Sequence, residues 1–106
     1  MPVVQIAEFK IQGDNRGTAN YDAMIERIGA DGNPPEGLIV HTAGWDEEGG
    51  VFRIVEVWES AEANERFRRD RLQPALDQGP VNRDDTRQPD RDVSYELHNV
   101  VRGQTS

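Results

Sequence analysis

The 106-residue sequence predicts an α+β fold in the order β-α-β-β-α-β, which is the split βαβ or ferredoxin-like arrangement. Three patterns predict this fold: two segments have apolar residues at helical spacing, four segments are rich in strand-forming residues, and a polar turn with two glycines joins the second and third of those four. Together they indicate one domain over residues 1–106, in which a four-stranded antiparallel sheet carries two helices on one face.

The first strand is expected over residues 3–11, where apolar side chains lie on both faces, as is typical of a central strand. A polar turn follows, after which Thr18 or Asn20 can cap a helix. Apolar residues recur with helical spacing over residues 21–28. Gly29 ends this helix, because glycine readily adopts the left-handed conformation of a helix C-terminus.

The middle of the chain predicts a β-hairpin. An apolar run over residues 37–45 is followed by a polar turn at residues 46–50, whose two glycines suit a tight connection. Residues 51–58 are mostly β-branched or aromatic, so they form the second strand of the hairpin.

The register of this hairpin decides which side chains share a face with His41, and the sequence leaves two alternatives open. In one register, His41 lies on the same face as Glu56 and Trp58. In the other, it lies on the same face as Val55 and Val57. A shift of one residue exchanges the two sets, because successive side chains of a strand point to opposite faces.

A second helix is expected after Ser60, whose hydroxyl can cap it, and Pro74 is expected to end or kink it because proline lacks the N–H that a helix interior needs. Residues 77–92 contain almost no apolar side chains, so they form either a long ordered loop or a mobile segment. Alternating apolar residues over 93–101 indicate the fourth strand, and residues 102–106 form a short tail.

The acidic composition argues against two classes of partner. Lys and Arg number 12 against 20 Asp and Glu, which gives a net charge of −8. Such a chain repels phosphate backbones and anionic membranes, so we expect neither nucleic acid nor a membrane as a partner. The arginines within residues 66–71 are interleaved with acidic residues, which indicates a solvated helix face; an anion-binding patch is the alternative.

The sequence also predicts a cytoplasmic protein without a resident cofactor. It has no cysteine, no apolar run of the roughly 20 residues that a membrane helix needs, and no apolar leader. The spacing of His, Asp and Glu does not suit a metal site, and no Gly-rich loop joins a strand to a helix as phosphate binding requires.

The predicted sheet leaves one face without helices, although its strands carry apolar residues on both faces. A second copy related by two-fold symmetry can cover that face, so we expect a homodimer. The apolar share of the sequence is modest, which also favours burying more apolar area through dimerisation.

Two polar residues within the apolar hairpin strands, His41 and Glu56, are the candidate catalytic groups. A neutral His41 imidazole can act as a general base toward a phenol or an acidic C–H group. Glu56 can pair with His41 or with Arg53, or act as a base itself, because an unpaired carboxylate is costly to bury. The alternatives are a half-buried histidine held by one hydrogen bond and a glutamate that faces solvent.

Two segments, residues 35–41 and 55–60, resemble the dimeric α+β barrels of the antibiotic biosynthesis monooxygenase-like superfamily. The second segment ends in Trp58-Glu59-Ser60 and precedes a helix with an aromatic residue, here Phe67, which is a pattern that recurs in that group. The resemblance implies a dimeric α+β barrel with a pocket between the helices and the sheet of each protomer.

The resemblance separates two kinds of activity. Heme-degrading members have a ligating histidine in the second helix, where residues 66–69 contain none, and an asparagine in the first strand, where this chain offers Gln5. Quinone-forming members work without a cofactor, and Trp58 and His41 match two of their polar points. The resemblance therefore implies a cofactor-independent monooxygenase-like enzyme for aromatic or polyketide-like substrates; a non-catalytic dimeric barrel that binds a ligand or a protein is the alternative.

Trp58, Tyr21 and Phe67 are the candidate substrate-binding residues. The Trp58 ring can stack on an aromatic substrate, and packing in the core is its alternative role. Tyr21 and Phe67 lie on the apolar faces of the two predicted helices.

Overall fold

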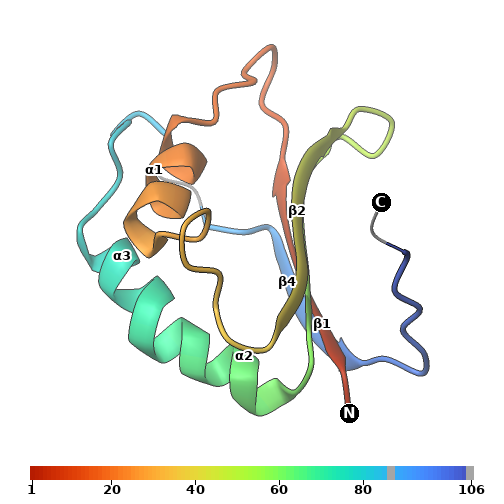
Figure 1. Cartoon of the computed structure of the whole chain (residues 1–106). Coiled ribbons are helices and arrows are strands. Elements are labelled where there is room, and N and C mark those ends of the chain that lie inside the picture. Colours follow the sequence, from red (N-terminus) through yellow and green to blue (C-terminus); the bar gives the residue numbers. More distant parts are fainter. Residues whose placement is uncertain (86–87, 105–106) are drawn as a thin grey trace.

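A computed structural model describes residues 1–85 and 88–104, so residues 86–87 of the expected loop and residues 105–106 of the expected tail lie outside the described part (Figure 1). The described elements confirm the predicted order of strands and helices. They are β1 (Val3–Lys10), α1 (Ala19–Ile28), β2 (Leu38–Asp46), β3 (Val51–Trp58), α2 (Ala61–Phe67), the π-helical turn η1 (Arg68–Leu72), α3 (Gln73–Asp77) and β4 (Arg91–Glu96).

The four strands form one antiparallel sheet in the order β2-β3-β1-β4, so the first strand is central, as its two apolar faces predicted. Both helical segments cover the same face of this sheet, and the chain after β4 turns to the other side (Figure 1). This is the α+β, ferredoxin-like fold expected from the sequence. No helix within the described residues is both long and apolar enough to cross a membrane.

The hairpin adopts the register that places His41 directly opposite Glu56. A bulge between Leu38 and Val40 disturbs the pairing only at the start of β2. Side chains alternate along each strand, so His41, Glu56 and Trp58 all belong to the face that the helices cover. The first of the two alternatives left open by the sequence is therefore the observed one.

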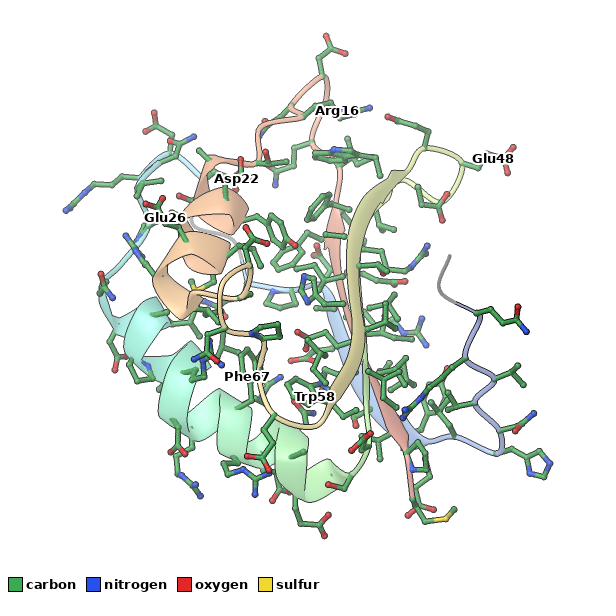
Figure 2. The ribbon with its side chains drawn as sticks, in the orientation of Figure 1. Arg16, Asp22, Glu26, Glu48, Trp58 and Phe67 are labelled. Carbon is green, nitrogen blue, oxygen red and sulfur yellow. The ribbon has the colours of Figure 1, made fainter. Side chains whose placement is uncertain are left out.

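The core lies between α2 and the start of β1 and the end of β3. Its buried cluster consists of Val3, Trp58, Ala63 and Phe67, with the Trp58 and Phe67 rings 5.1 Å apart between centroids. Figure 2 shows Trp58 and Phe67 facing each other from the sheet and the helix. Gly37, in the loop before β2, lies close to Ala63 of α2. Glycine allows this approach, because a Cβ at this position would lie 2.6 Å from the Ala63 Cβ.

The second helical segment begins as predicted and continues further than predicted. The Ser60 hydroxyl accepts a hydrogen bond from the Ala63 N–H at 3.1 Å, which confirms the cap. Pro74 was expected to end or kink the helix, but it lies in the first turn of α3, which runs on to Asp77. The helical segment can continue past this proline because the π-helical turn η1 comes directly before α3. Pro74 therefore lies in the first turn of α3, where a helix tolerates the missing N–H of proline.

The last strand is shifted relative to its expected span of residues 93–101. It covers Arg91–Glu96, and Glu96 is paired with Val3, the first residue of β1. Beyond this pair the neighbouring strand has ended, and the Leu97 N–H donates to the Pro2 carbonyl, just before β1. The end of β1 therefore fixes the end of β4, a constraint that the pattern of β4 alone does not contain.

The sheet face away from the helices is apolar over its half nearest the N-terminus of β1. Two of its exposed side chains are Val40 and Tyr95, at 45% and 53%. Pairing and strand alternation place the following residues on this face: Val4, Ile6, Val40, Val55, Val57, Val93 and Tyr95. The next row of residues on this face, beyond Ile6 and Val55, contains the charged pair Glu8 and Arg53. Arg53 donates to Glu8 at 2.6 Å and to Asp46 at 3.0 Å. The apolar rows are the surface on which we expect the second copy of a homodimer.

We expect the protein to sediment as a dimer at micromolar concentration and Val40→Lys to weaken the dimer. A buried, unpaired ammonium costs about 3 kcal/mol or more, which corresponds to a dissociation constant raised about a hundredfold. Leu76→Lys is the matched control, since Leu76 is a similarly exposed apolar residue on α3. Sedimentation of the unsubstituted protein as a monomer, or equal dissociation constants for the two variants, would contradict this surface assignment.

Candidate active site

A row of polar residues crosses the helix-facing side of the sheet. The pairing aligns one residue from each strand in this row: His41 of β2, Glu56 of β3, Gln5 of β1 and Ser94 of β4. The rows on either side are mostly apolar at the centre of the sheet, so these polar groups lie within an apolar layer. Polar groups in such a place must be hydrogen-bonded to one another or to the helices.

The first pair in the row is His41 and Glu56. Nδ1 of His41 lies 2.9 Å from Oε2 of Glu56, and the two side chains are 24% and 13% exposed. A carboxylate can only accept, so Nδ1 carries the proton that is donated to Glu56. In the neutral imidazole, Nε2 is then the unprotonated nitrogen and its lone pair is available as a base.

The Nε2 atom faces the hydroxyl of Tyr21, which α1 brings down onto the sheet. The Tyr21 Oη lies 2.7 Å from Nε2, so the phenol donates to the imidazole and a chain of two hydrogen bonds joins Tyr21, His41 and Glu56. The Tyr21 ring also packs edge-on against Phe52 of β3, with centroids 5.6 Å apart. The site therefore draws one residue from each of three elements.

The phenol is held in its protonated form. Burial raises the pKa of Tyr21 above its ordinary value, and the nearby carboxylates of Glu56, Asp22 and Asp31 raise it further. A protonated phenol is the species that can donate to Nε2 of His41. The electrostatics of the site thus support the direction of the hydrogen-bond chain.

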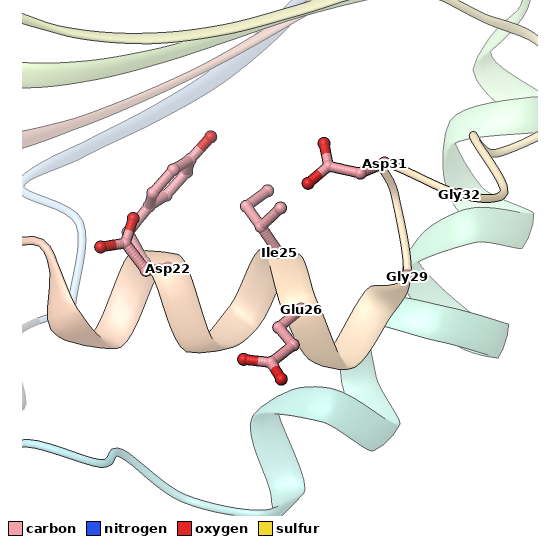
Figure 3. A pocket seen from close by; sticks show the side chains of 7 residues that line it. Asp22, Ile25, Glu26, Gly29, Asp31 and Gly32 are labelled. Atoms are coloured by element: carbon pink, nitrogen blue, oxygen red, sulfur yellow. The ribbon is translucent and has the colours of Figure 1, made fainter.

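Tyr21 also lines a pocket of about 500 Å³ beside α1 (Figure 3). Figure 3 shows Asp31 reaching back from the loop after α1 toward Ile25. The lining residues are Tyr21, Asp22, Ile25, Glu26, Gly29, Asp31 and Gly32. The volume is within the range of about 300–1,000 Å³ that is typical of small-molecule sites.

The pocket is negatively charged. Asp22, Glu26 and Asp31 contribute three carboxylates to its wall, and none of its lining residues in the described part of the chain is basic. The Arg71 guanidinium, which donates to the Ile28 and Asn33 carbonyls, lies at the Gly29 end, so the carboxylates face the Tyr21 end with a cation at the opposite end. Across the described residues, no group of three or more His, Cys, Asp or Glu side chains is arranged to hold a metal ion.

The other half of the polar row is tied to α2. Asn64 donates through Nδ2 to the Gln5 carbonyl at 3.1 Å, and Gln5 donates to Asp92 and to the Val93 carbonyl. The family resemblance singled out Gln5 only because it stands where an asparagine was expected, and no sequence pattern pointed to Asn64. The available signal was Gln5 itself, a polar residue between Val3 and Ala7 on the buried face of a central strand.

The five candidate residues fall into two groups. Tyr21, His41 and Glu56 form one continuous hydrogen-bond chain. Trp58 and Phe67 pack against each other in the core, and Trp58 has no exposed surface and does not line the pocket beside α1. The indole Nε1 of Trp58 is buried without a hydrogen-bond partner among the described residues.

In a Tyr95→Phe background, where Tyr21 is the remaining tyrosine, we expect ultraviolet titration to give a phenol midpoint above the ordinary value of about 10. The folded state keeps this proton to higher pH than the unfolded chain does. Its contribution to stability is therefore complete below about pH 10 and is lost as the pH rises through the folded-state pKa.

Adding Asp31→Asn should lower this midpoint because it removes a neighbouring negative charge, whereas Asp14→Asn, outside the pocket, should leave it unchanged. A Tyr21 midpoint at or below the ordinary value would contradict the buried, carboxylate-flanked position.

Comparison with known proteins bears on the fold. No model of a protein family matches the sequence, and no curated protein matches it significantly. A solved structure from Deinococcus radiodurans, described as a candidate antibiotic biosynthesis monooxygenase, superposes with a TM-score of 0.64 at 14% identity, covering 97% of this chain and 99% of that one. A similarly described protein from Chloroflexus aurantiacus gives 0.62 at 17% identity, covering 95% and 97%.

A third solved structure is a variant of SnoaB from Streptomyces nogalater, a cofactor-independent oxygenase. It gives a TM-score of 0.59 at 13% identity and covers 94% of this chain and 96% of that one. At such identities the likeness establishes the fold, and the chemistry must be argued from the residues of this chain. The chain thus has the fold of the antibiotic biosynthesis monooxygenases, as the resemblance in its hairpin and second helix predicted.

Proposed function

We propose that this protein is a cofactor-independent monooxygenase-like enzyme that removes a proton from an aromatic or polyketide-like phenol or enol. The observation that carries the proposal is the hydrogen-bond chain from Tyr21 through His41 to Glu56, which begins at the wall of the pocket beside α1. The fold shared with SnoaB, named as a cofactor-independent oxygenase, supports the reaction class.

The proton leaves the substrate through Tyr21. A substrate hydroxyl or acidic C–H in the pocket gives its proton to the Tyr21 oxygen as Tyr21 passes its own proton to Nε2 of His41, 2.7 Å away. The imidazolium that results is stabilised by the Glu56 carboxylate at 2.9 Å. His41 is thus the base, Glu56 fixes its tautomer, and Tyr21 connects the base to the pocket.

The deprotonated substrate then supplies the electrons for oxygen. An activated CH₂ group beside the phenol or enol loses its two hydrogens; one oxygen atom of O₂ becomes a carbonyl on that carbon, and the other leaves as water. The substrate is oxidised and O₂ is reduced, so the reaction balances without flavin, nicotinamide or metal.

Trp58 and Phe67 have a supporting part in this proposal. Trp58 lies two residues after Glu56 on the same face of β3, and Phe67 packs on its ring. Their packed rings exclude water from the core side of the carboxylate, which strengthens its interaction with His41. A direct stacking contact with substrate would require Trp58 to leave the core cluster.

The second candidate function is a non-catalytic barrel that binds a ligand or a protein. The observation that favours it is the packing around Trp58, which has no exposed surface. Trp58 lines neither the pocket beside α1 nor the hollow near Pro2 and Leu97. In this alternative the pocket beside α1 still holds a small molecule, and the hydrogen-bond chain serves only to satisfy buried polar groups.

An oxygen-uptake screen over hydroxylated aromatics should identify a substrate, and His41→Ala should lower its turnover about 10²–10⁴-fold, the usual contribution of a positioned base. Tyr21→Phe should also lower the turnover, because it breaks the same proton route. His98→Ala is the matched control, since His98 lies on the segment after β4, away from the chain of hydrogen bonds.

Circular dichroism should show that His41→Ala folds. Full turnover by folded His41→Ala would overturn the catalytic role. A ligand that binds the pocket without any oxygen uptake would favour the binding barrel.

A further inference from the structure

We propose that Tyr21 is a redox-active tyrosine, which gives one electron to an oxidant while its phenolic proton passes to Nε2 of His41. This goes beyond the proton relay of the proposed function, because here an electron leaves the ring and a neutral tyrosyl radical remains. The proposal stands on the geometry of the described residues, and its test needs no substrate turnover.

The first requirement of such a tyrosine is a proton acceptor in contact with its hydroxyl. Removing an electron from a phenol makes its O–H strongly acidic, so oxidation is easy only where the proton can leave in the same step. Nε2 of His41 lies 2.7 Å from the Tyr21 oxygen, and Glu56 binds the opposite nitrogen at 2.9 Å. The imidazolium formed is therefore paired with a carboxylate at once.

The second requirement is a path for the electron. The Tyr21 ring contacts Phe52 edge-on at 5.6 Å between centroids, and Phe52 contacts Trp45 at 4.7 Å. Trp45 is partly exposed near the end of the hairpin, where the Arg16 guanidinium lies 5.4 Å from the centre of its ring. Tyr21 is half-buried, and the three aromatic rings connect it to the end of the hairpin, at a distance from the pocket that it lines.

The direction of transfer follows from the proton. Among residues 1–85 and 88–104, no base is hydrogen-bonded to the Trp45 indole, whereas Tyr21 can release its proton to His41. The electron therefore moves from Tyr21 through Phe52 to an oxidised Trp45, and the radical that remains is on Tyr21. The fully buried Trp58 lies outside this path, among the core residues.

The oxidant we assign to this path is an organic peroxyl radical; its origin, as an escaped product of oxygen chemistry on a phenol, rests on the proposed function, whereas the oxidation of Tyr21 does not. The peroxyl radical gains one electron and becomes a peroxide anion, Tyr21 loses one electron, and His41 gains the proton. No heavy-atom bond forms or breaks in the protein, so a reductant that returns one electron, with the proton on His41, regenerates the starting state.

The test uses the Tyr95→Phe variant, in which Tyr21 is the remaining tyrosine, with photogenerated tris(bipyridine)ruthenium(III) as the one-electron oxidant. Electron paramagnetic resonance and transient absorption should detect a neutral tyrosyl radical, and adding Tyr21→Phe should abolish it. Adding His41→Gln should slow its formation about a hundredfold, the lower end of what a positioned base contributes. Adding His98→Gln, the other histidine, should not.

Two further variants keep the test decisive if His41→Gln does not fold. Glu56→Gln keeps the shape of the side chain and should slow radical formation, because it removes the charge that stabilises the imidazolium. Trp45→Phe should lower the radical yield with this bulky external oxidant. Equal rates with and without the His41 and Glu56 side chains, or a radical that stays on tryptophan while Tyr21 of the Tyr95→Phe variant is not oxidised, would overturn the proposal.

This outcome is separate from the proposed function. A tyrosyl radical in a protein that turns over no phenol would uphold the inference and count against the enzyme. Oxygen uptake by a protein that forms no tyrosyl radical would support the enzyme and overturn the inference.

Discussion

The pairing of His41 with Glu56 across the β2–β3 hairpin is the constraint on which the site depends. This register places both side chains under the helices, where an unpaired carboxylate or imidazole would be costly. It also turns Nε2 toward α1, so that Tyr21 completes the hydrogen-bond chain. A hairpin shifted by one residue would send His41 to the opposite face and would separate all three groups.

Local sequence signals were sufficient for most of the fold. The glycines of the hairpin turn, the Ser60 cap and the helix end at Gly29 act through neighbouring backbone atoms, so they could be recognised in the chain itself. The end of β4 and the course of the chain past Pro74 depend on a partner strand and on a π-helical turn. Those features arise from contacts between distant residues, which a single sequence does not display.

Three of the candidate residues are hydrogen-bonded to one another, a grouping that depends on a register the sequence left open. His41 and Glu56 stood out as polar residues in apolar strands, yet their contact required a choice of register that the sequence left open. Tyr21 reaches His41 from α1, and Asn64 reaches Gln5 from α2, so both contacts arise from the packing of helices on the sheet. Trp58, the most distinctive residue of the family resemblance, packs in the core against Phe67, which agrees with its large apolar ring.

Nitrogen-15 resonance of the His41 imidazole tests the central claim most directly, with His98→Ala used to assign the signals. In the neutral ring, the account predicts a proton on Nδ1 and none on Nε2, because Glu56 accepts from the first and Tyr21 donates to the second. Glu56→Gln should weaken this preference. A proton on Nε2 in the unsubstituted protein would contradict the account, because His41 could then neither accept from Tyr21 nor act as the base.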